Sequence, residues 1–230
     1  MELYEKQLER EEIYNGVVLH VVRDKVALPN GRVAYREMCL HKGAVAVVPL
    51  TADGNVIMER QFRYAHNRVF LEIPAGKLDR QDENPLDAAK RELKEETGAV
   101  AKKYTPLGAL DTTPALVNEK IYMYLAEDIE IGERKLDPDE FIDVELIPLS
   151  ELIDMVMKGE IQDAKTQIAI LKVARLKKMI SKPADWRIGA FPSTISRFFT
   201  QVCRPAYASE RGARLRHLCN ISRCRLLYPR

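Results

Sequence analysis

Short runs of β-forming residues, separated by strong turn signals, occupy the first eighty residues of the chain. An apolar run at 16–22 and a mixed run at 32–40 are joined by Pro29-Asn30-Gly31, a step that is typical of β-hairpins. Asp53-Gly54 predicts a second hairpin in the same way. The strands expected in this part of the chain are 16–22, 32–40, 44–50, 55–62 and 70–73.

The most complete helix signal begins at Asn84. Asn84 can cap the helix, Pro85 suits the first helical position, and Asp87 places a carboxylate in the first turn. Gly98 is a natural stop, so the helix is expected to end near Thr97. Later strands are expected at 104–111, 120–125 and 143–147, and later helices at 150–158 and 163–179. Hairpins combined with few helices favour an α+β fold over a doubly wound parallel sheet.

This helix carries three glutamates on one face. Glu92, Glu95 and Glu96 stand at i, i+3 and i+4, and each like-charge pair at that spacing costs about 0.2–0.5 kcal/mol in an isolated helix. A solvated acidic face is one interpretation. A divalent cation is the other, because Mg²⁺ prefers carboxylate oxygens and keeps water and phosphate oxygens as its remaining ligands.

The surrounding residues favour the cation. Residues 76–99 resemble the Nudix box, G-x5-E-x7-R-E-U-x-E-E-x-G-U with U apolar, and the second half matches at every position, including the seven residues between Glu83 and Arg91. Six residues instead of five separate Gly76 from Glu83, so the loop carries one extra residue. Asp82 in place of Glu83 would restore five residues after Gly76 but would leave eight, instead of seven, before Arg91. Because loops tolerate insertions better than helices do, Glu83 is preferred. The resemblance implies a Nudix fold, with a mixed β-sheet between helices.

The resemblance also implies roles for the box residues. Glu92, Glu95 and Glu96 are expected to bind Mg²⁺, or Mn²⁺ in its place, together with the backbone carbonyl of Ala75. A metal-activated water would attack one phosphorus of a diphosphate while the metal ions neutralise the developing charge. Glu83 and Arg91 are expected to orient the loop and the helix carboxylates. The residues expected to shape the box are Gly76, Glu83, Arg91 and Gly98.

Segments outside the box resemble the ADP-ribose pyrophosphatase branch of the family. Residues 60–64, RQFRY, and 71–76, LEIPAG, look like its QYR…E-φ-PAG run, in which φ is apolar. Pro114 lies sixteen residues beyond Gly98, where the branch carries a marker proline, although Ala115 follows it instead of the usual glycine. Residues 159–166 resemble the C-terminal segment of the branch. The resemblance implies hydrolysis of ADP-ribose to AMP and ribose 5-phosphate.

Three residues are candidates for contact with the substrate, and one for the catalytic base. Arg63 is the candidate clamp, because a guanidinium pairs bidentately with phosphate oxygens, and a surface arginine is the alternative. Glu72 is a candidate contact to substrate or metal, and Pro114 shapes the ribose side of the pocket. Glu140, in the acidic loop at 137–140, is the candidate base, with a solvated acidic turn as the alternative.

The N-terminal strands, residues 1–43, precede a hydrolase domain expected at 44–182. In this branch the N-terminal segment exchanges with a second subunit, and aromatic residues there enclose the adenine. A homodimer is therefore expected, with Tyr14 or Tyr35 as a contributor.

Charge changes abruptly near residue 183. Residues up to Lys182 include 11 Arg and 16 Lys against 32 acids, whereas 183–230 include 9 Arg, no Lys and two acids. A basic tail is therefore expected at 183–230, although arginine content alone does not predict a nucleic-acid partner. No run approaches the length of a membrane span, and the charged N-terminus is not a secretory signal, so we expect a cytoplasmic protein with a small nucleotide substrate.

Two other functions fit the same box. Another nucleotide sugar, such as GDP-mannose, or a dinucleotide would use the same metal chemistry. A non-catalytic domain that senses ADP-ribose is the second alternative. Sensors commonly lose box carboxylates, and Glu92, Glu95 and Glu96 are all present here, which favours the enzyme.

Overall fold

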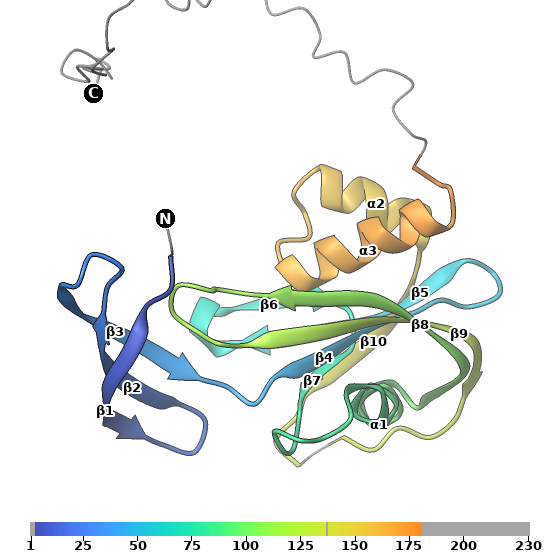
Figure 1. Cartoon of the computed structure of the whole chain (residues 1–230). Coiled ribbons are helices and arrows are strands. Elements are labelled where there is room, and N and C mark those ends of the chain that lie inside the picture. The colour runs from blue at the N-terminus through green and yellow to red at the C-terminus, as the bar shows by residue number, and fades with distance from the viewer. Residues whose placement is uncertain (1–2, 137, 181–230) are drawn as a thin grey trace, which may run out of the picture. The chain divides into compact units, whose positions relative to one another are not determined.

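Residues 3–136 and 138–180 are described by the structure, a computed structural model (Figure 1). The predicted tail at 183–230 lies outside the described residues. The first three strands form an antiparallel sheet in the order β1-β2-β3, with β1 at Lys6–Asn15, β2 at His20–Ala27 and β3 at Val33–Leu40. Gly31, in the predicted turn between β2 and β3, has a φ of 80°, a conformation that glycine adopts without strain.

Two further sheets form the body of the domain. One has the order β7-β4-β9-β8, in which β4 runs parallel to β9, and the other has the order β10-β5-β6. The strands of the first are β4 (Ala44–Pro49), β7 (Ala75–Lys77), β8 (Ala99–Asp111) and β9 (Lys120–Ile131). Those of the second are β5 (Asn55–Arg63), β6 (Arg68–Glu72) and β10 (Ile142–Pro148), with a 3₁₀ turn at Tyr64–His66 between β5 and β6.

Strand β4 lies at the centre of the fold, and all six of its residues are buried. Val45 and Val47 belong to the apolar cluster that includes Leu93 of α1 (Pro85–Thr97). Ala46 and Val48 belong to the cluster that includes residues of α2 (Leu149–Met157) and α3 (Ala164–Leu176). Figure 1 shows α1 on one side of the strands and α2 and α3 on the other. The predicted α+β fold, a mixed sheet between helices, is confirmed.

Two details of the predicted strands are wrong. The expected hairpin of 44–50 with 55–62 does not form, because β7 and β9 occupy both edges of β4, and β5 pairs with β6 and β10 instead. A single bridge between Leu50 and Val56 remains. Strand β1 was not expected, and the run at 16–22 is divided, because the amide of Gly16 donates to the carbonyl of Leu19 in a turn before β2.

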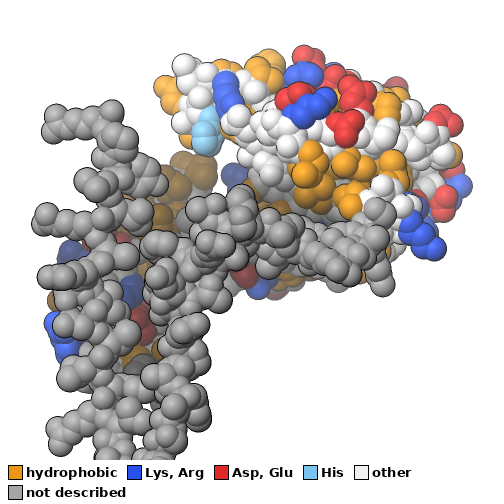
Figure 2. All heavy atoms as spheres, turned by 90° about the horizontal axis from the view of Figure 1, so that it is seen from above, with side chains coloured by type: hydrophobic (Ala, Val, Ile, Leu, Met, Phe, Trp, Pro, Cys, Tyr) orange, Lys and Arg blue, Asp and Glu red, His pale blue; other side chains and the backbone are white. Residues whose placement is uncertain are grey.

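The helical side of the domain carries an apolar groove between β8 and α3. Figure 2 views the protein from this side and shows hydrophobic side chains gathered beside charged ones. The groove is lined by Pro106, Leu107, Ile168, Leu171, Lys172, Arg175 and Leu176. No helix in the described part of the chain is long and apolar enough to cross a membrane.

Candidate active site

A cleft of about 890 Å³ opens beside the acidic face of α1. Strands β5 and β7, helix α1, the loop before β10 and the start of α3 contribute side chains to it. The predicted site residues that line it are Arg63, Ala75, Gly76, Arg91, Glu92, Glu95, Glu96 and Glu140. The structure therefore brings together the expected metal-binding residues, the expected clamp and the expected base.

Local signals position α1 as the sequence predicts. The helix spans Pro85–Thr97, the side chain of Asn84 accepts a hydrogen bond from the amide of Leu86, and Gly98 ends the helix with a φ of 74°. A Cβ at Gly98 would lie 2.4 Å from the carbonyl oxygen of Gly132, so this position excludes a side chain. The cap and the stop fix which residues of α1 face the cleft.

The three glutamates of α1 differ in exposure. Glu96 is 4 % exposed, whereas the side chains of Glu92 and Glu95 are 12 % and 45 % exposed. An oxygen of Glu96 accepts a hydrogen bond from the amide of Ala75 at 3.0 Å. A Cβ at Gly76 would lie 2.0 Å from Cδ of Glu92, so glycine lets the loop approach the helix closely. The glutamates thus form a row from the interior to the mouth of the cleft.

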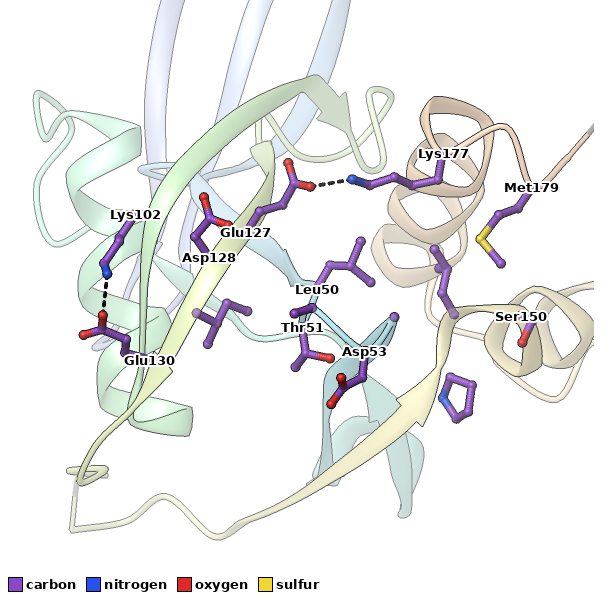
Figure 3. A pocket seen from close by; sticks show the side chains of 15 residues that line it. Leu50, Thr51, Asp53, Lys102, Glu127, Asp128, Glu130, Ser150, Lys177 and Met179 are labelled. Carbon is purple, nitrogen blue, oxygen red and sulfur yellow. Dashed lines mark hydrogen bonds and ion pairs between the residues drawn. The ribbon is translucent and has the colours of Figure 1, made fainter.

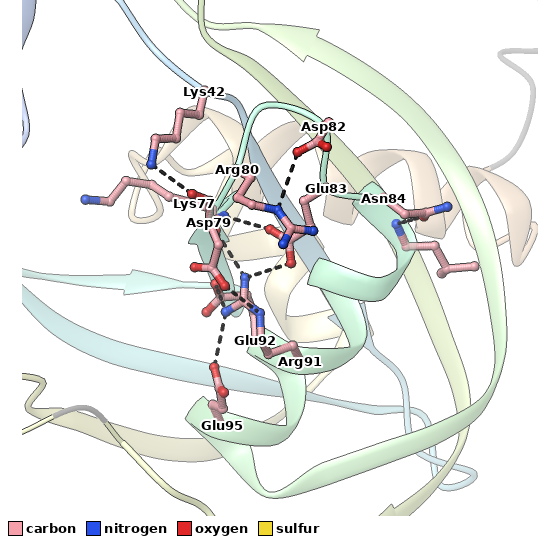
Figure 4. Close-up of polar contacts among 11 residues, drawn as sticks. Lys42, Lys77, Asp79, Arg80, Asp82, Glu83, Asn84, Arg91, Glu92 and Glu95 are labelled. Carbon is pink, nitrogen blue, oxygen red and sulfur yellow. Dashed lines mark hydrogen bonds and ion pairs between the residues drawn. The ribbon is translucent and has the colours of Figure 1, made fainter.

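Arg91 connects this row to the loop before the helix (Figure 4). Its guanidinium bonds Glu92 at 2.7 Å, Glu95 at 3.3 Å and Glu83 at 3.3 Å. The other carboxylate oxygen of Glu83 accepts from the amide of Asp79 at 2.6 Å. Asp82, by contrast, is exposed and forms an ion pair with Arg80. These contacts favour Glu83 over Asp82 as the box residue, despite the extra residue in the loop.

Burial and mutual repulsion disfavour the charged forms of the inner glutamates. Burial raises the pKa of Glu92 to about 7, although Arg91 opposes the shift. Burial, followed by the charges of Glu59, Glu92 and Glu140, raises the pKa of Glu96 from its ordinary value of 4.5 to about 10. A bound cation would stabilise the carboxylate forms of these side chains.

The side chains of the cleft fit a hard divalent cation by their chemistry, since carboxylate oxygens are its preferred ligands. In the described residues, no three acidic, histidine or cysteine side chains converge closely enough to hold an ion as they stand. Arg91 bonds both Glu92 and Glu95, so ion binding requires these two side chains to turn toward Glu96. An oxygen of Glu59, buried nearby, has no hydrogen-bond partner.

A second set of charged groups is centred on Glu72 at the end of β6, and Arg63, Asp163 and Lys165 of this set line the cleft. Arg63 bonds both carboxylate oxygens of Glu72 at 2.8 Å, and Lys165 bonds Glu72 and also pairs with Asp163 at 3.1 Å. Burial alone would raise the pKa of Glu72, but the bonds to Arg63 and the charge of Lys165 lower it below its usual value. Glu72 is thus an ionised anchor for two cationic side chains that line the cleft.

Some site residues were missed, and some predicted ones lie outside the cleft. Lys165 and Glu59 were not predicted, although Lys165 falls in the segment 159–166 that resembles the family. Pro114 is exposed and is not among the lining residues, whereas Thr112 and Thr113 just before it are. Tyr14 and Tyr35 are exposed on the N-terminal sheet and do not line this cleft.

A separate cavity of about 700 Å³ lies near the turn between β4 and β5 (Figure 3). Two of its carboxylates are paired with lysines: Glu130 with Lys102 at 2.5 Å, and Glu127 with Lys177. None of the box residues lines it. These two paired carboxylates can be compared with the carboxylates of the cleft beside α1.

A box helix with this cap, packed on a mixed sheet and facing an acidic cleft, is the arrangement of a Nudix domain. A family model described as NUDIX domain matches residues 40–168, and the chain belongs to this family. The ADP-ribose pyrophosphatase of Bacillus subtilis (strain 168) is 43 % identical over 170 residues, which are 73 % of this chain and 91 % of that protein.

Two more proteins are similar over most of the chain. The methanol dehydrogenase activator of Bacillus methanolicus is 38 % identical over 168 residues, which are 72 % of this chain and 90 % of that protein. The crystal structure of an ADP compounds hydrolase matches with a TM-score of 0.69 and 24 % identity, covering 78 % of this chain and 97 % of that chain. The resemblance predicted from the sequence is therefore confirmed.

Proposed function

We propose that this protein is a magnesium-dependent hydrolase that cleaves the diphosphate of ADP-ribose to AMP and ribose 5-phosphate. The observation that carries the proposal is the convergence of Glu92, Glu95, Glu96 and Glu140 with Arg63 and Lys165 on one cleft. Similarity to an ADP-ribose pyrophosphatase over 91 % of its length supports the substrate. Hydrolases of the Nudix family generally need a divalent metal ion.

The glutamates of α1 would hold the ion, with the carbonyl oxygen of Ala75. Magnesium, when bound there, supplies the activation of a water molecule and neutralises charge on the phosphate oxygens. Glu140 accepts a proton from the attacking water as the general base. The water oxygen forms a bond to one phosphorus, the bond from that phosphorus to the bridging oxygen breaks, and the leaving phosphate keeps the electron pair.

Arg63 and Lys165 would bind the diphosphate. A guanidinium has five N–H donors, and the pair with Glu72 uses two of them, so the same arginine has donors left for phosphate oxygens. Glu72 acts by orienting both cations toward the cleft. Proline at 114 follows two lining threonines and would act through the position of that loop.

The N-terminal sheet supports a homodimer. All ten residues of β1 are exposed, and so are the apolar side chains of Val17, Val18 and Leu19 in the turn that follows. An exposed edge strand and exposed apolar groups are features that a second subunit would cover. Tyr14 and Tyr35, on the same sheet, would then be available to the partner's adenine site.

The experiment is a product assay on the full chain, with ADP-ribose, GDP-mannose and a dinucleotide compared in Mg²⁺, in Mn²⁺ and in EDTA. Release of AMP and ribose 5-phosphate from ADP-ribose, fastest of the three and absent in EDTA, is the expected result. Glu127→Gln, in the separate cavity, is the control for loss of a carboxylate. An intact ADP-ribose pool beside rapid cleavage of another nucleotide would remove the substrate assignment. We also propose a cytoplasmic location, which a small nucleotide substrate supports.

A further inference from the structure

Glu59 is a buried carboxylate that none of the assigned roles uses. It lies in β5 directly after three buried apolar residues, Val56, Ile57 and Met58, and it is 4 % exposed. In the antiparallel register of β5 and β6, Glu59 stands opposite Glu72, so both side chains lie on the same face of the sheet. Gln61 and Arg63, on the same face of β5 as Glu59, line the cleft that Glu96 also lines, and the charge of Glu59 raises the pKa of Glu96.

The surroundings of Glu59 leave its carboxylate uncompensated. Oε1 is buried and has no hydrogen-bond partner. The two nearest cationic groups, those of Arg63 and Lys165, are bonded to Glu72, and Lys165 also pairs with Asp163. Burying a carboxylate without a partner is costly, whereas another apolar side chain would continue the strand at no such cost. A positive charge beside Glu59 would stabilise its carboxylate form, whereas without one burial favours the neutral acid.

The acidic groups around Glu59 indicate the kind of charge. Glu72, Glu96 and Glu140 all contribute electrostatically to Glu59 or are affected by it. Glu96 is the most deeply buried glutamate of α1, and it uses Oε2 for the amide of Ala75. Two buried glutamates, one of which has an unpartnered oxygen, match the donor chemistry of a hard divalent cation.

We propose that Glu59 is a further carboxylate of the metal site, which binds a divalent cation jointly with Glu96 at the inner end of the cleft. This inference rests on the proposed function only in placing the metal on α1. It adds a ligand from β5, outside the box, and so connects the metal to the central strands of the fold.

Metal binding by the full chain tests the inference directly. Mn²⁺ is titrated into the wild type, Glu59→Gln and Glu59→Val, with affinity measured by calorimetry and free Mn²⁺ by electron paramagnetic resonance. Glu59→Gln keeps the size of the side chain, and Glu59→Val continues the apolar run of β5. Both are expected to bind Mn²⁺ about tenfold or more weakly than the wild type. The control Glu127→Gln, whose carboxylate pairs with Lys103 and Lys177, is expected to bind as the wild type does.

Thermal unfolding with and without Mn²⁺ provides a second readout. Both Glu59 variants should keep their folded circular dichroism spectrum but show a smaller rise in Tm on addition of Mn²⁺. Unchanged Mn²⁺ affinity and an unchanged rise in Tm in both variants would overturn the inference and leave Glu59 as a neutral acid or a partner of Lys165. Wild-type protein that binds Mn²⁺ through Glu59 but leaves ADP-ribose intact would overturn the proposed substrate alone.

Discussion

Glu96→Gln is expected to stabilise the metal-free protein by an amount that grows with pH. The pKa of Glu96 is raised from 4.5 to about 10 by burial and by neighbouring carboxylates. The folded state therefore keeps Glu96 protonated at neutral pH, whereas the unfolded chain releases the proton above about pH 4.5. The stability that this group contributes is thus complete below pH 4.5 and is lost progressively as pH rises toward 10. Glutamine has no proton to release, so the variant lacks this loss.

The change in this stability difference with pH is set by the pKa of Glu96 in the unfolded chain, as long as the pKa of Glu96 in the folded protein stays well above 7. Each pH unit between 4.5 and the folded value costs the wild type about 1.4 kcal/mol. Between pH 5 and pH 7 the stability of Glu96→Gln relative to the wild type should therefore rise by about 2–3 kcal/mol. Constant effects, such as the extra N–H of the glutamine, cancel in this difference. The amide of Ala75 can still donate to the glutamine oxygen, as it does to Glu96.

Urea unfolding in EDTA at pH 5, 6, 7 and 8 measures this difference. Glu127→Gln is the matched control, because hydrogen bonds from Lys103 and Lys177 lower the pKa of Glu127. The stability that Glu127 contributes is present above its ordinary pKa and is lost as pH falls, which is the opposite of the behaviour of Glu96. Glu127→Gln should therefore be less stable than the wild type at pH 7. A stability difference for Glu96→Gln that is the same at pH 5 and pH 8 would refute the reasoning. In Mg²⁺, turnover of Glu96→Gln should fall by about a hundredfold or more.

The tight loop, the exposed N-terminal sheet and the basic tail each lead to a measurable outcome. Gly76→Ala should fold, since only the end of the Glu92 side chain must move, but its hydrolysis rate should fall about a hundredfold; normal kinetics would show that this packing is unimportant. Sedimentation at micromolar concentration should give a homodimer, and a fully active monomer would exclude the proposed role of β1. Truncation after Lys182 should leave folding and the rate on ADP-ribose unchanged, and loss of either would make 183–230 part of the working structure.

Local signals made α1 and its site predictable from the sequence. Asn84, Pro85 and Gly98 determine where the helix begins and ends through contacts within a few residues. The glutamate spacing then follows from helical geometry, which places Glu92, Glu95 and Glu96 on one face. The observed helix accordingly has the predicted limits, and the box residues meet at one cleft.

Partners distant in sequence explain what could not be predicted. Asp53-Gly54 forms a turn as expected, but the choice of β6 and β10 as neighbours of β5 depends on strands far along the chain. Strand β1 has no buried face, so it lacks the alternation that reveals a strand. Glu59 stands beside Arg60 and Gln61 at a polar end of a strand, so its neighbours in sequence give no sign that it is buried.

The loop before α1 has a consequence for recognising such proteins in genomes. Leu78 is buried and its amide donates to the carbonyl of Gly43, while Asn84 caps the helix, so both ends of the loop are anchored. The exposed residues between them absorb the extra residue in a turn from Arg80 to Glu83, and Glu83 still reaches Arg91. A search string of fixed length would pass over this chain. A search that fixes the two anchors and lets the interval vary would retain it, together with any other member whose surface turn has lengthened.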